Sequence, residues 1–212
     1  MQAERLTTAC GQMMAGPLLL APRVFGDARG YFFESWNQRT FASALEADGQ
    51  PVPPFVQDNH SRSCRGVLRG LHYQLPPHPQ GKLVRCVLGS ILDVAVDLRR
   101  SSPTFGQWVA AELSAENHQQ LWVPVGFAHG FLTLSEHAEV LYKATDFWSK
   151  DCERGLRWDD PELAISWPLQ VVGVDQPSTG TGFPLAAAEP VLAEKDAAAP
   201  LMAEAVSAGD VF

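Results

Sequence analysis

Hydrophobic and polar residues alternate over short stretches through the middle of the chain, from about residue 55 to residue 145. In the stretch 91–99, aliphatic side chains at alternate positions share one face, whereas Asp93 and Asp97 share the other. Similar runs cover 83–89, 108–113, 120–123, 127–134 and 139–145. Short strands separated by glycine and proline turns are typical of a β-sandwich or barrel, so we expect a mainly β fold of the jelly-roll type with few short helices.

The first third of the chain is less regular. Residues 1–14 show no clear period, and we expect a weakly ordered leader before a strand at 18–25. The glycines and the aspartate of 26–30 are typical of a turn. Asn37 is a good N-cap for a short amphipathic helix that ends at Gly49.

Turn and linker signals divide the rest of the chain. Gly89-Ser90 predicts a two-residue hairpin between the runs on either side of it. Residues 173–184 are rich in Gly, Pro, Ser and Thr, which indicates a loop or linker. We therefore expect one jelly-roll domain over 1–172 and a C-terminal segment, 185–212, that contains a short alanine-rich helix and packs back on the barrel.

Composition narrows the class of protein. The chain has 212 residues, enough for one domain with a sizeable core, and 46% of them are hydrophobic. A net charge of -8 argues against a general nucleic-acid-binding surface. No apolar run approaches the ~20 residues that span a bilayer, and no two cysteines are spaced as CxxC. We expect a cytoplasmic protein that binds neither nucleic acid nor membrane.

The stretch from Cys64 to Arg85 carries the candidate chemistry. A cupin-type jelly roll that holds a metal typically uses an HxH segment with a glutamate and a later histidine. Here the first segment reads His72-Tyr-Gln74 and no glutamate follows it, although His129 is present downstream. An amide is a poor ligand for a transition metal, and nearby Lys82 and Arg69 suit an anion instead. We therefore expect no metal.

A histidine beside cationic groups has a lowered pKa and suits a general base near neutral pH. Such a base requires a carboxylate to orient its ring and an acid on the opposite side, for which Tyr142 is a candidate. A lysine near a carbonyl oxygen stabilises an enolate. These parts predict proton abstraction next to a carbonyl, as in isomerisation or epimerisation. The alternative is that they are ordinary charged residues on solvated strand faces.

The chain strongly resembles the dTDP-4-dehydrorhamnose 3,5-epimerase family, because several long motifs of that family occur here in the same order. Members of this family are metal-free cupin-fold enzymes of dTDP-L-rhamnose synthesis. The resemblance covers about 18–168 and resumes at 192–196. It is carried by Phe25-Gly-Asp-Ala-Arg-Gly, Phe55-Val-Gln-Asp-Asn-His-Ser, Gly66-Val-Leu-Arg-Gly-Leu-His-Tyr-Gln, Gln80-Gly-Lys-Leu-Val-Arg, Asp93-Val-Ala-Val-Asp-Leu-Arg, Ser101-Ser-Pro-Thr-Phe-Gly and Pro124-Val-Gly-Phe-Ala-His-Gly-Phe.

The resemblance implies a mechanism without a cofactor. His72 would remove protons at C3 and C5 of dTDP-4-dehydro-6-deoxy-D-glucose, and Asp196 would orient its ring. Tyr142 would return a proton on the opposite face, and Lys82 would stabilise the enolate at O4. The implied ligands of the nucleotide and sugar are Arg29, Glu34, Gln57, Asn59, Arg69, His129, Glu153 and Lys195.

The resemblance also implies a homodimer formed through N-terminal strands, in which Glu34 can reach across to the thymine of the partner's site. The family often has a tyrosine that stacks on this thymine, and Trp148 stands near that place here; a Trp ring preserves the stacking face. Because Asp93 points opposite its apolar neighbours, we further predict that it forms a second oriented pair with His129 at the substrate.

Related activities stay open at this point. A 5-epimerase, a 3,4-ketoisomerase or a non-catalytic cupin that binds nucleotide sugars would share most of these motifs. The presence of His72, Lys82 and Tyr142 argues against the non-catalytic alternative.

Overall fold

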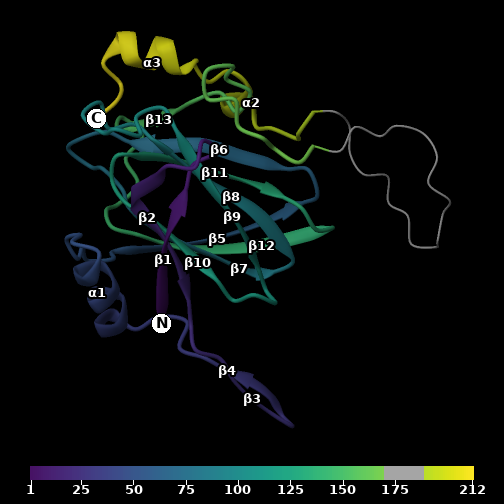
Figure 1. Ribbon diagram of the computed structural model, residues 1–212. Coiled ribbons are helices and arrows are strands. Elements are labelled where there is room, and N and C mark those ends of the chain that lie inside the picture. The colour runs from purple at the N-terminus through teal and green to yellow at the C-terminus, as the bar shows by residue number, and fades with distance from the viewer. Residues whose placement is uncertain (170–188) are drawn as a thin grey trace, which may run out of the picture.

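Two antiparallel β-sheets pack face to face in the computed structural model, which describes residues 1–169 and 189–212 (Figure 1). One sheet has six strands in the order β1-β2-β10-β7-β12-β5, and the other has five in the order β13-β6-β11-β8-β9. The mainly β jelly roll expected from the alternating pattern is confirmed. The six-stranded sheet contains β1 (Gln2–Thr7), β2 (Met13–Ala21), β10 (Gln120–Val123), β7 (Lys82–Leu88), β12 (His137–Ala144) and β5 (Gln57–Cys64). The five-stranded sheet contains β13 (Glu153–Gly155), β6 (Leu68–Gln74), β11 (Phe127–Thr133), β8 (Ser90–Asp97) and β9 (Trp108–Ser114).

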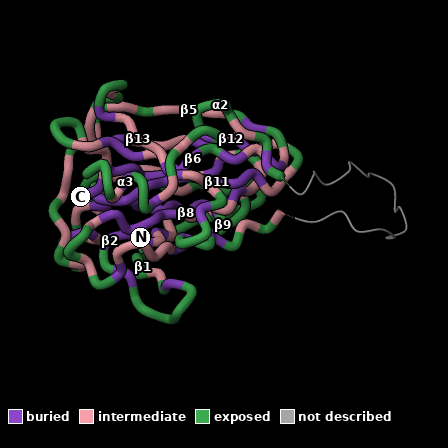
Figure 2. The backbone as a smooth tube through the Cα atoms, turned by 90° about the horizontal axis from the view of Figure 1, so that it is seen from above, coloured by how far each residue is buried: buried purple, intermediate pink, exposed green. Residues whose placement is uncertain are grey.

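The alternation in β8 builds two hydrophobic layers at once. Ile91 and Ala95 belong to the cluster between the two sheets, which includes Val84 from the facing sheet. Val94 and Val96 point the other way, into a cluster covered by the C-terminal segment. Both faces of this strand are therefore buried, and Figure 2 shows buried backbone running through the centre of both sheets.

Short helices cover the outer faces of the sheets. Helix α1 (Gln38–Ala47) packs Phe41 and Leu45 against the six-stranded sheet, in a cluster with Trp122. As predicted, Asn37 caps this helix: its side chain accepts hydrogen bonds from the backbone N–H groups of Arg39 and Thr40. On the other side, α2 (Glu194–Ala197) and α3 (Met202–Ala208) accompany the five-stranded sheet.

The C-terminal segment is attached to the five-stranded sheet by hydrogen bonds as well as by packing. Val191 forms a parallel bridge with Val67, and Phe212 exchanges backbone hydrogen bonds with Leu98 and Arg100. Met202 and Ala205 of α3 are buried in the cluster with Val94 and Val96. The linker predicted at 173–184 lies outside the described residues.

Two local predictions are wrong. Residues 1–14 do not form a loose leader, because β1 pairs antiparallel with β2 at the edge of the sheet. Most side chains of β1 are exposed, so backbone hydrogen bonds hold this strand and its sequence lacks an apolar period. The hairpin at Gly89-Ser90 is absent as well: β7 pairs with β10 and β12, and β8 pairs with β9 and β11. Gly89, at a φ of 71°, takes the chain from one sheet to the other.

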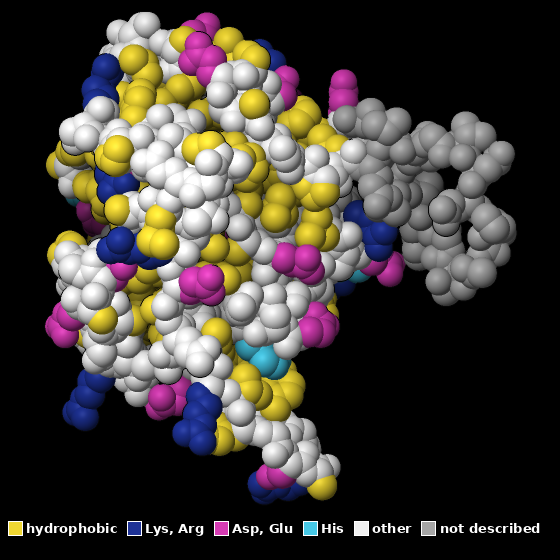
Figure 3. All heavy atoms as spheres, in the orientation of Figure 1, with side chains coloured by type: hydrophobic (Ala, Val, Ile, Leu, Met, Phe, Trp, Pro, Cys, Tyr) yellow, Lys and Arg dark blue, Asp and Glu magenta, His cyan; other side chains and the backbone are white. Residues whose placement is uncertain are grey.

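The turn predicted at 26–30 is confirmed, and it forms the tip of an arm. Strands β3 (Phe25–Asp27) and β4 (Gly30–Phe32) pair with each other and with no other strand of the described residues, and they project from the body of the molecule (Figure 1). The arm exposes Phe25, Tyr31 and Phe32, each by half or more of its surface. Figure 3 shows basic, acidic and hydrophobic side chains together at its tip.

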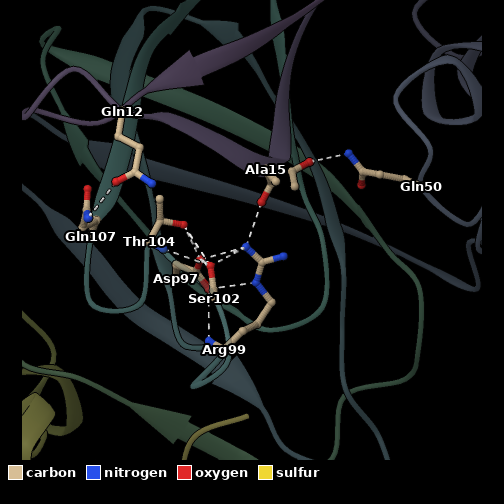
Figure 4. A network of polar contacts seen from close by, with 9 residues as sticks. Gln12, Ala15, Gln50, Asp97, Arg99, Ser102, Thr104 and Gln107 are labelled. Atoms are coloured by element: carbon tan, nitrogen blue, oxygen red, sulfur yellow. Dashed lines mark hydrogen bonds and ion pairs between the residues drawn. The ribbon is translucent and has the colours of Figure 1, made fainter.

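A buried carboxylate organises the turn after β8 (Figure 4). Asp97 is fully buried and accepts hydrogen bonds from Arg99 Nε at 2.8 Å, Ser102 Oγ at 2.5 Å and Thr104 Oγ1 at 2.7 Å. Burial raises the pKa of Asp97, but these hydrogen bonds outweigh it and hold the pKa below its usual value. Arg99 also donates to the Ala15 carbonyl at 2.8 Å, which links this turn to β2.

Replacing Asp97 by Ala leaves the Arg99 guanidinium without its carboxylate, so we expect Asp97→Ala to lower the free energy of unfolding by about 3 kcal/mol. Urea denaturation at neutral pH measures this loss. The matched control is Asp159→Ala, which removes an exposed pair with Arg157 and is expected to leave the urea midpoint in place. Equal midpoints for both variants would show that the Asp97 network contributes nothing to stability.

Candidate functional site

Polar side chains from both sheets gather at one end of the barrel. Strands β6 and β11 bring His72 and His129 side by side, because these two residues are direct partners in the antiparallel register. The facing sheet contributes Lys82 at the start of β7 and Tyr142 from β12. The two sheets thus supply different parts of one site.

Asp196 binds the ring of His72. Its Oδ1 lies 2.6 Å from His72 Nε2, and its Oδ2 accepts a hydrogen bond from the Gly70 N–H at 3.4 Å. Asp196 is only 4% exposed although it follows the undescribed segment by a few residues. A cavity of about 260 Å³ opens beside the pair and is lined in part by Glu153 and Lys195.

The environment sets the charge of this pair. Burial lowers the pKa of His72 below its ordinary 6.5, and the ammonium groups of Lys82 and Lys195 act in the same direction, whereas Asp196 opposes them. Burial raises the pKa of Asp196, but the hydrogen bonds from His72 and Gly70 and the charge of Lys195 outweigh it and keep the pKa below its usual value. At neutral pH the site therefore holds a neutral imidazole that donates from Nε2 to an ionised carboxylate.

The predicted pairing of Asp93 with His129 is confirmed. His129 Nε2 lies 2.7 Å from Asp93 Oδ1, and both side chains are buried. Among the described residues, the second oxygen of Asp93 has no hydrogen-bond partner. A buried acceptor without a partner is costly, so this oxygen is placed to receive a donor from a ligand or from water.

Lys82 is a buried cation. It is 8% exposed, and its Nζ donates to the His72 carbonyl at 3.3 Å. Burial lowers the pKa of Lys82 to about 8, while Asp93 and Glu153 partly counteract this effect. Tyr142 lies opposite Asn59 in the register of β12 and β5, and burial raises the pKa of its phenol. A charged ammonium and a protonated phenol are thus both present at neutral pH.

Further predicted ligands line the same end of the sheets. Arg69 donates from Nε to Ser63 Oγ at 3.0 Å and lies near enough to Tyr142 to oppose the rise in its pKa. Gln57 Nε2 donates to Asn59 Oδ1 at 3.0 Å, and Gln57 Oε1 accepts from the Trp148 N–H at 3.1 Å. Trp148 is 55% exposed, so its aromatic side chain is accessible to a ligand.

Glu153 and Lys195 form an ion pair beside Asp196. Lys195 Nζ lies 3.1 Å from Glu153 Oε1, which joins α2 to β13. Burial raises the pKa of Glu153, but Lys195 outweighs it and holds the pKa below its ordinary value. This pair fastens the residue next to Asp196 to the same sheet that carries His72.

Two predicted ligands lie apart from the others in this single chain. Arg29 is at the turn of the β3–β4 arm and pairs with Asp27 at 2.5 Å (Figure 1). Glu34 follows the arm and accepts a hydrogen bond from Asn37 at 3.0 Å. The arm projects away from the end of the barrel that holds His72, so a single chain does not unite all of the predicted site.

Sequence reasoning missed the part played by Gln74. In the sequence, Gln74 stands only where a metal-binding cupin has a histidine. In the structure it is 3% exposed, and its amide forms hydrogen bonds with the backbone of two other segments. A buried glutamine next to the candidate base was the available signal, since a buried amide must find partners. No group of three or more His, Cys, Asp or Glu side chains within 1–169 and 189–212 is arranged to hold a metal ion.

Taken together, a neutral imidazole, an ionised partner carboxylate, a buried ammonium and a phenol suit proton transfer next to a carbonyl. A jelly-roll fold with such a group of side chains is typical of an enzyme that transfers protons. No helix in the described part of the chain is long and apolar enough to cross a membrane.

Comparison with known proteins identifies the family. Residues 12–204 match the family model described as dTDP-4-dehydrorhamnose 3,5-epimerase. The chain is 67% identical to the dTDP-4-dehydrorhamnose 3,5-epimerase of Pseudomonas aeruginosa over 153 residues, which is 72% of this chain and 82% of that protein. It is 52% identical to the Salmonella typhimurium enzyme of the same name over 189 residues, 89% of this chain and 92% of the relative. The chain therefore belongs to the dTDP-4-dehydrorhamnose 3,5-epimerase family, and it is an isomerase.

Solved structures agree on the fold. The rmlC epimerase of Mycobacterium tuberculosis superposes with a TM-score of 0.83 at 35% identity, covering 100% of this chain and 93% of that one. The Legionella pneumophila dTDP-6-deoxy-D-glucose-3,5-epimerase, solved with dTDP-4-keto-L-rhamnose, gives a TM-score of 0.77 at 42% identity over 94% and 93%. The 3'-monoepimerase ChmJ of Streptomyces bikiniensis, solved with dTDP-quinovose, gives 0.78 at 31% identity over 92% and 88%.

The buried charge of Lys82 is expected to oppose folding. The unfolded chain keeps the lysine proton up to its ordinary pKa of 10.5, whereas the folded chain releases it near 8. The penalty is therefore full below pH 8 and fades as the pH rises to 10.5. We expect Lys82→Met to raise the free energy of unfolding at pH 7 by at most about 3 kcal/mol, and by less at higher pH.

Thermal denaturation from pH 7 to pH 10 measures this difference. Lys150→Met, at an exposed lysine, is the control and is expected to change the melting temperature little at any pH. A Lys82→Met protein that melts below the wild type at pH 7 would mean that the interactions of the ammonium exceed the cost of its burial.

Proposed function

We propose that this protein converts dTDP-4-dehydro-6-deoxy-D-glucose to dTDP-4-dehydro-L-rhamnose by inverting C3 and C5, and that it does so in the cytoplasm as a homodimer. The observation that supports this most directly is the His72–Asp196 pair, at 2.6 Å, beside the buried ammonium of Lys82. The membership of the chain in the epimerase family supplies the substrate class.

The substrate explains why these groups are needed. C3 and C5 both neighbour the C4 carbonyl, so a proton on either carbon is acidified by that carbonyl. With Nε2–H donated to Asp196, Nδ1 of His72 is the basic nitrogen that takes the proton. The electron pair moves to O4, where the Lys82 ammonium stabilises the enolate. Tyr142 then delivers a proton to the opposite face of the carbon, which inverts it.

The pKa shifts fit these roles at neutral pH. A lowered pKa leaves His72 unprotonated and ready to accept. A pKa of about 8 leaves Lys82 charged below that value, and a raised pKa keeps Tyr142 protonated. Activity therefore depends on a base that must be neutral and a cation that must keep its proton, and it falls on both sides of neutrality.

Binding of the nucleotide sugar is assigned to the groups around this centre. Trp148 stacks on the thymine, since its ring is exposed and its backbone is tied to Gln57. Arg69 supplies charge for the diphosphate. Asp93 orients His129 at the sugar, and its free oxygen is placed to accept from a hydroxyl group. The remaining assigned ligands are Asn59, Glu153 and Lys195.

The exposed arm explains why a dimer is proposed. Arg29 and Glu34 are assigned to the substrate, yet Arg29 lies at the turn of the β3–β4 arm, which projects from the body of the molecule (Figure 1), and Glu34 follows this arm and binds Asn37. Its apolar side chains at Phe25, Tyr31 and Phe32 are more exposed than a free surface favours. If a second subunit receives the arm, these side chains become buried. Arg29 and Glu34 of one subunit would then lie at the His72 site of the other subunit.

Turnover of the 4-keto substrate in deuterated water tests the reaction. We expect deuterium at both C3 and C5, seen by NMR, because each inversion exchanges the carbon-bound proton with one derived from solvent. His72→Ala is expected to lose activity by at least about 10²–10⁴-fold. Deuterium at C3 alone would instead indicate a monoepimerase, the activity named for ChmJ.

Subunit complementation tests the shared site. Arg29→Ala and His72→Ala are each expected to be nearly inactive, because each removes one part of every site. In a co-expressed heterodimer, one site combines the intact His72 of one subunit with the intact Arg29 of the other. About a quarter of wild-type activity is expected for the statistical mixture, since half of the dimers are mixed and each has one complete site. No recovery in purified heterodimers, isolated through two different tags, would place Arg29 in the site of its own chain.

A further inference from the structure

Gln74 uses its whole amide to join three segments of the chain. It ends β6, two residues after His72, and it is 3% exposed. Its Nε2 donates to the His78 carbonyl at 2.6 Å and to the Phe147 carbonyl at 3.2 Å. Its Oε1 accepts from the Ser149 N–H at 2.8 Å. Both amide hydrogens and the carbonyl oxygen are therefore committed to backbone.

These bonds bracket Trp148. The backbone groups on either side of it, the Phe147 carbonyl and the Ser149 N–H, bind the same Gln74 amide. The Trp148 N–H itself binds Gln57, and Gln80 Nε2 donates to the Asp146 carbonyl at 2.7 Å. Because Trp148 is 55% exposed, packing contributes little to its position, which depends on these hydrogen bonds and on the hydrogen bond of its side chain with Glu153.

We propose that Gln74 is a positioning residue for nucleotide binding. Gln74 lies on the same strand as His72, and it fixes the position of the Trp148 segment relative to His72. This inference rests on the proposed function, in which Trp148 stacks on the thymine. Gln74 touches neither the sugar nor the base in this assignment, so it acts through the backbone of residues 147 and 149. Its loss should weaken binding of the nucleotide and leave the proton transfer intact.

The chemistry of an amide explains why glutamine is required. Glutamate has the same size and keeps the acceptor for the Ser149 N–H, but an ionised carboxylate cannot donate to the carbonyls of His78 and Phe147. It would instead oppose two carbonyl oxygens at hydrogen-bond distance. Methionine fills a similar volume and provides neither donor nor acceptor. Both substitutions free the Trp148 segment, each for a different reason.

The decisive experiment is a double-mutant cycle on dTDP binding, with Gln74→Met, Trp148→Ala and the combined variant, followed by calorimetry. Each single variant is expected to raise the Kd for dTDP about ten-fold, which is within the range known for base–aromatic stacking. In the Trp148→Ala background, Gln74→Met is expected to add less than about two-fold, because the ring that it positions is already gone. Steady-state kinetics should show a higher KM for Gln74→Met with kcat within about two-fold of the wild type.

Gln50→Met is the matched control. Gln50 also bridges backbone, since its Nε2 donates to the Gly16 carbonyl at 2.6 Å, and it also accepts from Trp122 Nε1 at 2.9 Å. It lies in the segment after α1, on the outer side of the six-stranded sheet. Gln50→Met is expected to lower thermal stability with the Kd for dTDP unchanged, which separates a general loss of stability from a loss of positioning.

Several results would overturn the proposal. If the fold-changes in Kd of Gln74→Met and Trp148→Ala multiply in the combined variant, the two residues act independently. A fall in kcat with constant KM in Gln74→Met would place Gln74 in the proton-transfer step. An unchanged Kd in Trp148→Ala would remove the ring that Gln74 is said to position. Gln74→Glu provides the same cycle where the methionine variant does not fold. Failure of the proposed function is read separately, as the absence of deuterium exchange by the wild-type enzyme.

Discussion

The hydrogen bond between His72 and Asp196 joins residues that are 124 positions apart, and the chemistry of the site depends on it. It determines which nitrogen of the imidazole carries the proton and therefore which nitrogen is basic. It also ties the C-terminal segment to β6, where Gly70 adds a second bond to the same carboxylate. The ion pair of Lys195 with Glu153 supports the same attachment from the neighbouring residue. The segment that completes the fold over the five-stranded sheet thus also supplies the carboxylate that binds the proposed base.

Most ionisable side chains at this end of the barrel lie next to a group of opposite charge, and Lys82 lacks such a close partner among the described residues. His129, which is buried, and His72, which is partly exposed, each have their own carboxylate, at 2.7 Å and 2.6 Å. Lys82 has no such close carboxylate within the described residues, and burial lowers its pKa to about 8. A cation that the protein itself compensates poorly is well suited to receive the negative charge of an enolate, because that charge takes the place of a carboxylate partner. The cost to stability and the gain for chemistry have the same physical origin.

Polar side chains, rather than packing, hold the parts of the site that face solvent. Gln57, Gln74 and Gln80 each bind backbone of the segment that carries Trp148. An exposed ring, such as the one proposed to stack on the nucleotide, cannot be held by burial, so its backbone has to be held by hydrogen bonds. The Arg29 side chain has no hydrogen-bond partner in the described part of its own chain beyond Asp27, and the arm contacts the body of the molecule through Tyr31, whose ring packs against His118. This limited attachment fits a role at a subunit interface.

By itself, the sequence determined the elements whose signal is local. The alternation of 91–99 predicted a strand with two distinct faces, and it also predicted that Asp93 would turn toward His129, because side-chain direction follows from the two-residue period. Asn37 predicted the start of α1, because a helix cap is a contact between residues that are near neighbours in the sequence. The motifs that indicate the family are continuous stretches of the chain, so their residue types and order carry that information without the fold.

Only the tertiary structure decided which strands pair and which distant groups meet. The turn at Gly89 suggested a hairpin, yet β7 and β8 belong to opposite sheets, because a short turn sets a local bend and leaves the choice of partner to packing across the barrel. Strand β1 had no hydrophobic period, since hydrogen bonds to β2 hold it at an exposed edge. The sequence presents Gln74 as a replaced metal ligand, whereas its partners Phe147 and Ser149 lie more than 70 residues away along the chain. Contacts of this range leave no period in the sequence, because each depends on the folded course of both segments.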